Sequence, residues 1–488
     1  MLDFMKPSKP RKNLVPEELI PNRYFQRKVG VFISLYLAYA GYYIIRADFK
    51  IASPYLIEQF GFTKTDIGGI LAAYAIVYGF AKFFMGALCD KANSHYYITL
   101  GLVLSAVLNL SFAGTKSIPV FYALMLFMAV TQSMGGPAVS KILSAWFAKY
   151  ERGTYMSIWN TSHNAGAALA APIAITLGFA LMGAGNIKAI FIVPTVVSLV
   201  LAVIVFVTGA ENPQSVGLPT IEEYKPEASD VSAKDDYHTE LTFFEIFKKY
   251  FLTNKYVWFL VLANGFVYMV RYGVSDWIPI YLSEGKGFTK EEAGYMFSFF
   301  ELIAIPGTIL IGFISDKLFK AKRVPLAIGC MALLIIAVFA YWQTADKTMI
   351  IVLIGLMGIL VYGPQMLIAV LTLDMVPRFA IGALVGFVGL FGYVLGEMGA
   401  SLVVGILSDT FGWGGVFVFI IVGTIIGLFC FVGLLKFEND ELDKKKKIQD
   451  DQKADKNAPA KADSAKKAPA KSSTAKKAPV KKAPAKKK

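Results

Sequence analysis

Twelve stretches of about 20 mostly apolar residues dominate this chain, and a helix needs about that many to cross the hydrocarbon core of a bilayer. They lie at 29–50, 67–89, 96–114, 118–146, 154–181, 187–208, 256–282, 292–314, 324–342, 348–375, 379–406 and 414–436. Hydrophobic residues make up 56% of the chain and charged residues only 17%, so a soluble enzyme is excluded. The sequence predicts an all-α integral membrane protein with twelve transmembrane helices.

A long polar connection at 209–254 divides the spans into two sets of six. Lys and Arg gather before the first span and in the loop after the eighth, which places both termini in the cytoplasm by the positive-inside rule. The first 28 residues have no apolar core of a signal peptide, so no cleaved leader is expected. The predicted organisation is an N-terminus at 1–28, a six-helix bundle at 29–208, a central loop at 209–254, a second six-helix bundle at 255–437 and a tail at 438–488.

The net charge of +14 belongs almost entirely to the tail, because Lys444 to Lys488 hold 17 Lys against 4 Asp. This Lys/Ala/Pro-rich segment cannot bury enough apolar surface to fold, so we expect disorder. Tethered at a membrane, it is expected on anionic lipids or in solvent rather than on nucleic acid. Three scattered Cys and three His form no metal or disulfide pattern, and no cofactor is expected.

A short loop pattern repeats in the two halves. Gly86 to Asp90, followed by Lys91, comes after the second span, and Gly312 to Asp316, followed by Lys317, comes after the eighth, 226 residues later. Gly allows close helix approach, and Asp can pair with a base or cap a helix end. Two copies at one offset inside a six-plus-six pattern resemble the signature loop of the major facilitator superfamily. In such carriers the substrate lies near the membrane midplane between the halves.

Two arginines occupy matching places inside the spans. Arg46 and Arg271 lie 225 residues apart, each after an aromatic and apolar stretch. A charge within a membrane is costly and is therefore a functional candidate. Two guanidinium forks that face each other across a central cavity suit a phosphate, whose oxygens they match bidentately. The alternative is that Arg46 only snorkels to the outer interface.

Other polar side chains also fall within spans. They are His163, Lys82 and Glu301, together with the tyrosines Tyr39, Tyr43, Tyr78, Tyr268, Tyr362 and Tyr393. Many such tyrosines serve only packing or the interface belt. Lys82 and Glu301 are candidates for a structural or gating pair.

The residues of the fifth span carry a more specific resemblance. Arg152-Gly153, Trp159-Asn160, His163-Asn164 and Ala165-Gly166-Ala167 are similar to the pattern of the organophosphate:phosphate antiporter family of the major facilitator superfamily, which includes glycerol-3-phosphate and hexose-6-phosphate transporters. The likeness covers about residues 20–437. Further stretches resemble the glycerol-3-phosphate branch, namely Pro213-Gln214-Ser215, Ile221 to Lys225, Arg271-Tyr272-Gly273 and Gly389 to Tyr393.

The resemblance implies a function and roles for these residues. Two bundles rock about one site and exchange inorganic phosphate for a small organophosphate, with glycerol 3-phosphate slightly favoured over hexose 6-phosphate. Arg46 and Arg271 would bind the phosphoryl group together with His163. Lys82 and the six tyrosines would line the cavity. The empty carrier would cross poorly, because two unpaired Arg would repel each other.

Three departures from the family pattern bear on this expectation. Ala47 stands where relatives often have a Lys that pairs with the acid at Asp276, so Asp276 is expected to lack its bridge. Gly135-Gly136-Pro137 replaces an aromatic turn, and Glu397 adds an acid where a hexose-phosphate relative has Asp. The last two favour a bulkier or hydroxyl-rich substrate. Asp276, Glu301 and Glu397 are therefore candidates for gating or charge coupling.

Two alternatives stay open at this stage. A membrane receptor of the same fold would bind the ligand without moving it, and a proton-coupled symporter would use His163, Glu301 or Glu397. No motif for bond-breaking chemistry is present, so we expect a carrier and not an enzyme. We further expect a monomer in a bacterial inner membrane.

Overall fold

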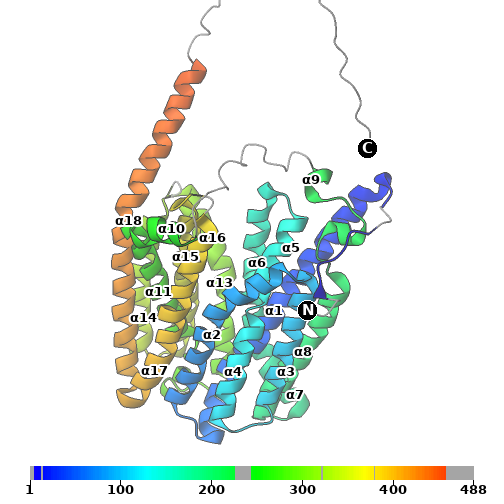
Figure 1. Ribbon diagram of the computed structural model, residues 1–488. Coiled ribbons are helices and arrows are strands. Elements are labelled where there is room, and N and C mark those ends of the chain that lie inside the picture. The colour runs from blue at the N-terminus through cyan, green and yellow to red at the C-terminus, as the bar shows by residue number, and fades with distance from the viewer. Residues whose placement is uncertain (1–4, 12–14, 226–242, 320–321, 378–379, 458–488) are drawn as a thin grey trace, which may run out of the picture. The chain divides into compact units, whose positions relative to one another are not determined.

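The computed structural model describes residues 5–11, 15–225, 243–319, 322–377 and 380–457. Contacts divide the chain into two compact units, Met1–Glu438 and Asn439–Lys488. Within the described residues, twelve helical segments are long and apolar enough to cross a membrane. The predicted all-α membrane architecture is therefore confirmed (Figure 1).

The helices of the N-terminal half, residues 29–208, follow the predicted spans. They are α1 (Ile20–Phe60), α2 (Lys64–Asp90), α3 (Ser94–Phe112), α4 (Ile118–Gln132), α5 (Gly135–Trp146), α6 (Lys149–Ala171), η3 (Pro172–Leu177), α7 (Gly178–Met182) and α8 (Ile187–Thr208). α4 and α5 form one span, and α6, η3 and α7 form the next. α1 is much longer than the predicted first span and reaches beyond it at both ends.

Short helices occupy the described parts of the central loop, and longer ones build the C-terminal half, residues 255–437. The loop holds η4 (Pro213–Val216), α9 (Ile221–Tyr224), α10 (Phe243–Ile246) and η7 (Phe247–Leu252). The half holds α11 (Lys255–Ser275), α12 (Ile278–Gly285), α13 (Lys290–Lys317), α14 (Arg323–Gln343), α15 (Lys347–Asp374), α16 (Ile381–Phe391), η9 (Gly392–Met398), α17 (Gly399–Thr410) and α18 (Gly412–Asn457).

α18 reaches further than the sequence analysis expects. It ends at Asn457, inside the segment 438–488 that was predicted to be disordered. The chain between Gly433 and Pro459 contains no glycine or proline and many good helix formers, which favours continuation of a helix. The remainder of the predicted tail, 458–488, and its expected lipid contacts lie outside the described residues.

The two halves pack through a few helix pairs. α2 lies against α17 and η9, and α6 lies against α13. We call the end of the bundle where α1 begins the N-terminal end, and the end where α1 stops at Phe60 the far end. Figure 1 shows α9 and α10 at the N-terminal end.

Bridges between the halves gather towards the far end. Lys64 pairs with Glu284 at 3.0 Å, and the backbone and hydroxyl of Thr65 both donate to Asp409 at 2.7 Å. The Tyr55 hydroxyl donates to Glu291 at 2.8 Å, and Lys290 pairs with Glu58, as a further bridge of the same kind. In this structure, direct polar contacts therefore hold the halves together at the far end.

Glycine permits the close approach of α2 and α17 at the far end. A Cβ added at Gly405 would lie 2.7 Å from the carbonyl oxygen of Lys64 and 3.3 Å from the Cα of Gly68. Neither backbone atom can move away as a flexible side chain could. A side chain at this position would therefore push the halves apart.

For the carrier that the sequence predicts, we expect Gly405→Ala to slow transport by about tenfold, because overpacking costs about 1–3 kcal/mol and the clash arises where α2 and α17 meet at the closed far end. The measurement is the rate of substrate movement in proteoliposomes at equal amounts of inserted protein. Gly399→Ala is the matched control on the same helix, since a Cβ there would meet nothing within 4 Å. Equal rates for the two variants would contradict this role of the contact.

Candidate functional site

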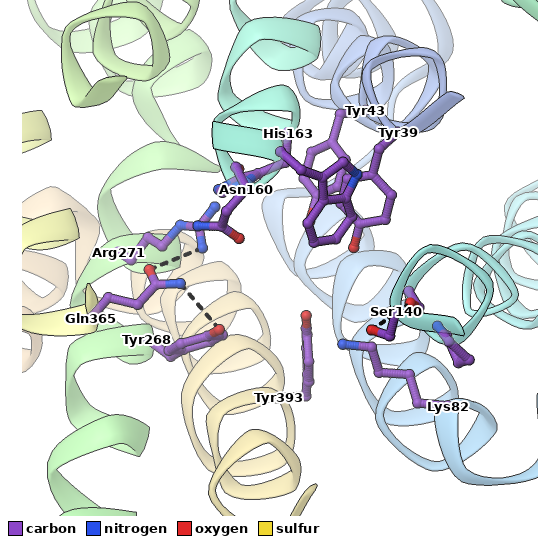
Figure 2. A pocket seen from close by; sticks show the side chains of 13 residues that line it. Tyr39, Tyr43, Lys82, Ser140, Asn160, His163, Tyr268, Arg271, Gln365 and Tyr393 are labelled. Carbon is purple, nitrogen blue, oxygen red and sulfur yellow. Dashed lines mark hydrogen bonds between the residues drawn. The ribbon is translucent and has the colours of Figure 1, made fainter. Parts of the chain in front are cut away.

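A cavity of about 390 Å³ lies between the two halves, in the part of the bundle nearer the N-terminal end. Figure 2 shows side chains from both halves pointing into it. Its lining residues are Tyr39, Tyr43, Lys82, Gly136, Pro137, Ser140, Trp159, Asn160, His163, Tyr268, Arg271, Gln365 and Tyr393. Two of them are cations, Lys82 and Arg271, and none is an acid. The cavity therefore favours an anion.

Arg271 lies on the cavity wall of the C-terminal half and is only 4% exposed. Its Nη1 donates to Gln365 Oε1 at 3.2 Å, and the Gln365 amide in turn donates to the Tyr268 hydroxyl at 3.2 Å (Figure 2). Among the described residues its Nε has no hydrogen-bond partner. A buried unsatisfied donor is costly, so an anion that accepts from this guanidinium would relieve the cost.

His163 lies on the opposite wall, on α6, with one ring nitrogen engaged and the other free. Its Nδ1 bonds to the carbonyl oxygen of Asn160, which can only accept, so Nδ1 carries a proton. Its Nε2 is buried and has no partner in the described part of the chain. Nε2 can accept from a P–OH group when the ring is neutral, or donate to a phosphate oxygen when it is charged.

Lys82 brings the second cation to the cavity. Its ammonium lies 5.1 Å from the ring centroids of both Tyr78 and Tyr393. The described residues offer it no carboxylate within ion-pair distance. Tyr78 packs behind the wall, edge to face with Tyr393 at 5.0 Å, and does not itself line the cavity. The aromatic faces thus hold a cation that remains available to a ligand.

Arg46 does not line the main cavity. It lies behind it and shares a small second cavity with Arg271, Tyr43, Lys50 and Glu301, among others. Its side chain is 6% exposed, which rules out snorkelling to an interface. The two arginines therefore meet at one place between the halves, as their matching positions in the sequence predict.

Glu397 is the partner of Arg46. Arg46 Nη2 lies 2.7 Å from Glu397 Oε1, and the carboxylate is 3% exposed. Arg46 sits on α1 of the N-terminal half, whereas Glu397 sits on η9 of the C-terminal half. The expectation that both arginines are unpaired in the empty carrier is therefore wrong for Arg46.

Glu301 also joins the halves, but not through Lys82. It accepts from Asn164 Nδ2 at 2.7 Å and from the Tyr362 hydroxyl at 2.6 Å. Lys82 instead contacts aromatic rings, so the predicted Lys82–Glu301 pair is wrong. Tyr362 lies just behind the main cavity, and its ring centroid is 4.4 Å from the Arg271 guanidinium carbon.

Asp276 has a bridge after all. Lys50 Nζ lies 2.5 Å from Asp276 Oδ1, and both side chains are buried. The prediction that Ala47 leaves this acid unpaired is wrong, because Lys50, three residues further along α1, falls on a nearby part of the same helix face. Sequence reasoning missed Lys50, although a lysine one turn after Arg46 within an apolar span is a visible signal.

Sequence reasoning also did not single out Asp48 and Ser140 as candidate functional residues. Asp48 is fully buried and accepts from Asn109 Nδ2 at 2.6 Å within the N-terminal half. Ser140 on α5 lines the main cavity (Figure 2). A lone serine in an apolar stretch gives no signal of this kind, whereas an intramembrane Asp does.

The repeated loop residues do not line the main cavity. Asp316 pairs with Arg323 at 3.6 Å. Lys141 Nζ donates to the carbonyl oxygens of Cys89, Asp90 and Ala92. Gly86 and Gly312 show no close backbone approach, since an added Cβ would meet only side-chain atoms of Pro137 and Met366 at 3.4 Å or more. These loops stabilise helix ends at the N-terminal end.

Comparison with known proteins supports the same fold. The family model of the Major Facilitator Superfamily matches residues 31–400. The chain is 39% identical over 434 residues to a glycerol-3-phosphate transporter of Bacillus subtilis (strain 168), covering 88% of this chain and 96% of the relative. It is 38% identical to a phosphoglycerate transporter protein of Salmonella typhimurium (strain LT2), covering 87% and 93%.

A third relative and a solved structure extend the comparison. The chain is 31% identical to a hexose-6-phosphate:phosphate antiporter of the same Salmonella strain, covering 92% of this chain and 99% of the relative. The crystal structure of a bacterial homologue of the human lysosomal transporter Spinster superposes with a TM-score of 0.67 at 16% identity, covering 86% and 98%. At that identity the structure supports the fold alone.

Proposed function

The chain belongs to the Major Facilitator Superfamily, among carriers of organophosphates, and on that premise we propose that it exchanges a small organophosphate for inorganic phosphate across the membrane. The observation that carries the proposal is the cavity of about 390 Å³, which is lined by Lys82 and Arg271 and by no acid. A phosphate group there meets two cations, the free Nε2 of His163 and several hydroxyl donors. No bond is made or broken, so the protein is a transporter and not an enzyme.

The proposed cycle follows from the charges. An organophosphate enters the main cavity, and its phosphoryl group binds Arg271 and His163. It reaches Arg46, which lies behind the cavity, by displacing Glu397. Binding satisfies the Arg271 Nε that otherwise has no partner in the described structure. The bound anion then lets the bundles rock and open the other side, and phosphate makes the return journey.

A three-carbon phosphate is the favoured substrate. The two relatives with identities of 39% and 38% are named for glycerol 3-phosphate and phosphoglycerate, whereas the relative named for hexose 6-phosphate shares 31%. Between the first two we favour glycerol 3-phosphate. Its hydroxyls suit the tyrosine, asparagine and glutamine groups on the cavity wall.

We place the N-terminal end of the bundle in the cytoplasm of a bacterial inner membrane, with the carrier acting as a monomer. The Lys and Arg of residues 1–28 and of the loop after α13 support this orientation. With the far end held by ion pairs, the cavity in this structure would then face the cytoplasm.

Counterflow tests the exchange and the substrate together. Proteoliposomes loaded with phosphate are expected to accumulate labelled glycerol 3-phosphate, and to do so faster than glucose 6-phosphate. A receptor that binds glycerol 3-phosphate but cannot transport it gives no accumulation of label inside the vesicles. Vesicles loaded with sulfate at the same ionic strength are the control for non-specific anion leak.

Three outcomes separate the alternatives. Absence of uptake of glycerol 3-phosphate, 3-phosphoglycerate and glucose 6-phosphate would contradict the proposal and favour a receptor. Uptake that depends on an inward proton gradient and ignores internal phosphate would favour a proton-coupled symporter. Faster uptake of glucose 6-phosphate would overturn only the substrate preference.

A further inference from the structure

Two buried cations at the centre of the bundle each have a carboxylate as a partner. Arg46 pairs with Glu397 at 2.7 Å, and Lys50 pairs with Asp276 at 2.5 Å. Each pair joins the N-terminal half to the C-terminal half. Two of the buried cations thus have a carboxylate partner before any substrate arrives.

Arg271 has no direct carboxylate partner among the described residues but is connected to Glu301 through Tyr362. Its guanidinium carbon lies 4.4 Å from the Tyr362 ring centroid, and the Tyr362 hydroxyl donates to Glu301 at 2.6 Å. Arg271 and Glu301 also line the same small cavity. Lys82 is the remaining cation on the wall, so four cations (Arg46, Lys50, Arg271 and Lys82) face three carboxylates (Glu397, Asp276 and Glu301) and leave a net charge of +1.

This balance bears on what the empty carrier can do. A carrier is confined to exchange when its empty site holds charges that cannot pass through the occluded state without a counter-ion, because burial of an unpaired charge is costly. Here the Glu397 carboxylate engages Nη2 of Arg46, a donor that a phosphate oxygen would otherwise use. The empty carrier already holds an internal anion in place of the substrate.

We propose that this protein also performs net transport, in which phosphate or organophosphate moves one way down its gradient while the carrier returns empty, with Glu397 bound to Arg46. This rests on the proposed function, since it concerns the same site. When phosphate binds, it displaces Glu397 from Arg46. When phosphate leaves, Glu397 restores the pair and the halves can close again around it.

The test compares efflux with and without a counter-substrate in one preparation. Proteoliposomes are loaded with labelled phosphate and potassium, and valinomycin clamps the membrane potential. They are diluted into medium free of phosphate and organophosphate, and efflux is followed before and after addition of glycerol 3-phosphate. The wild type is expected to release label before the addition as well as after it.

Glu397→Gln is the diagnostic variant, because the amide keeps the volume and removes the internal anion. Net efflux is expected to fall more than exchange, so that their ratio drops by about tenfold, a change equivalent to about 1.4 kcal/mol. The matched control is Glu222→Gln, which neutralises an exposed acid of the central loop that lies 3.9 Å from Arg152. This control is expected to keep the wild-type ratio.

The outcomes for this inference and for the proposed function differ. Exchange without any net efflux from the wild type would overturn the inference and leave the proposed function intact. An unchanged ratio in Glu397→Gln would likewise overturn it. Net phosphate efflux without exchange against any organophosphate would support empty return and overturn the proposed substrate class.

Discussion

Replacement of Arg271 by lysine is expected to reduce phosphate exchange by about a hundredfold or more. A planar guanidinium can give two parallel hydrogen bonds to phosphate, whereas an ammonium is a point charge on a flexible stem. Each hydrogen bond to a charged group contributes about 1.5–3 kcal/mol, so loss of the fork corresponds to about two orders of magnitude. Arg271 is also the arginine that directly lines the main cavity.

Arg46→Lys is expected to be nearly as damaging. A lysine at this position can still pair with Glu397 in the empty carrier. Once phosphate displaces Glu397, however, a single ammonium cannot hold the phosphate bidentately as a guanidinium does. The measurement is the exchange of labelled phosphate in proteoliposomes. The control is Arg23→Lys, which makes the same change at an exposed position on the same helix as Arg46 and should keep most of the activity. Near-normal exchange in Arg271→Lys or Arg46→Lys would refute the model of two arginine forks.

The fold was predictable because its main determinant is local. Each span needs only a run of apolar residues, and the internal repeat of Asp90 and Asp316 orders the spans into two halves. The meeting of Arg46 and Arg271 was predictable for the same reason, because a repeat related by symmetry brings equal positions together. The most visible error in the helix boundaries is the extension of α18, where helix propensity carries the chain on to Asn457.

The pairings at the site were not predictable, because they depend on which helix faces meet. Glu397 lies 351 residues from Arg46, and nothing local connects them. Lys82 and Glu301 looked like partners only because both are charges within spans. Packing instead turned Lys82 towards aromatic rings and Glu301 towards Asn164 and Tyr362. Opposite charges in a sequence therefore predict a need for partners but not their identity.

Removal of the lysine from the Lys50–Asp276 pair is expected to lower the rate of phosphate exchange to about one hundredth of the wild-type rate or less. Lys50→Ala leaves a fully buried carboxylate without its cation, and breaking such a pair costs about 3–5 kcal/mol. The bridge joins α1 to the C-terminal half beside both arginines, so the loss acts on the site and on closure of the far end. Exchange and thermal unfolding in detergent are measured together, to separate lost function from lost fold.

Transfer of the lysine by one turn provides the decisive comparison. Ala47 and Lys50 line the same small cavity, and their Cα atoms are separated by about 4.5 Å of helix rise. The double variant Ala47→Lys, Lys50→Ala should therefore restore the pair with Asp276 and recover at least about a tenth of wild-type exchange. Ala47→Lys alone should not help, because it adds a cation without adding an acid. Normal phosphate exchange by Lys50→Ala alone would show that the bridge has no part in transport. A double variant no better than an impaired Lys50→Ala would show that transport needs the lysine at position 50 for something other than its pairing with Asp276.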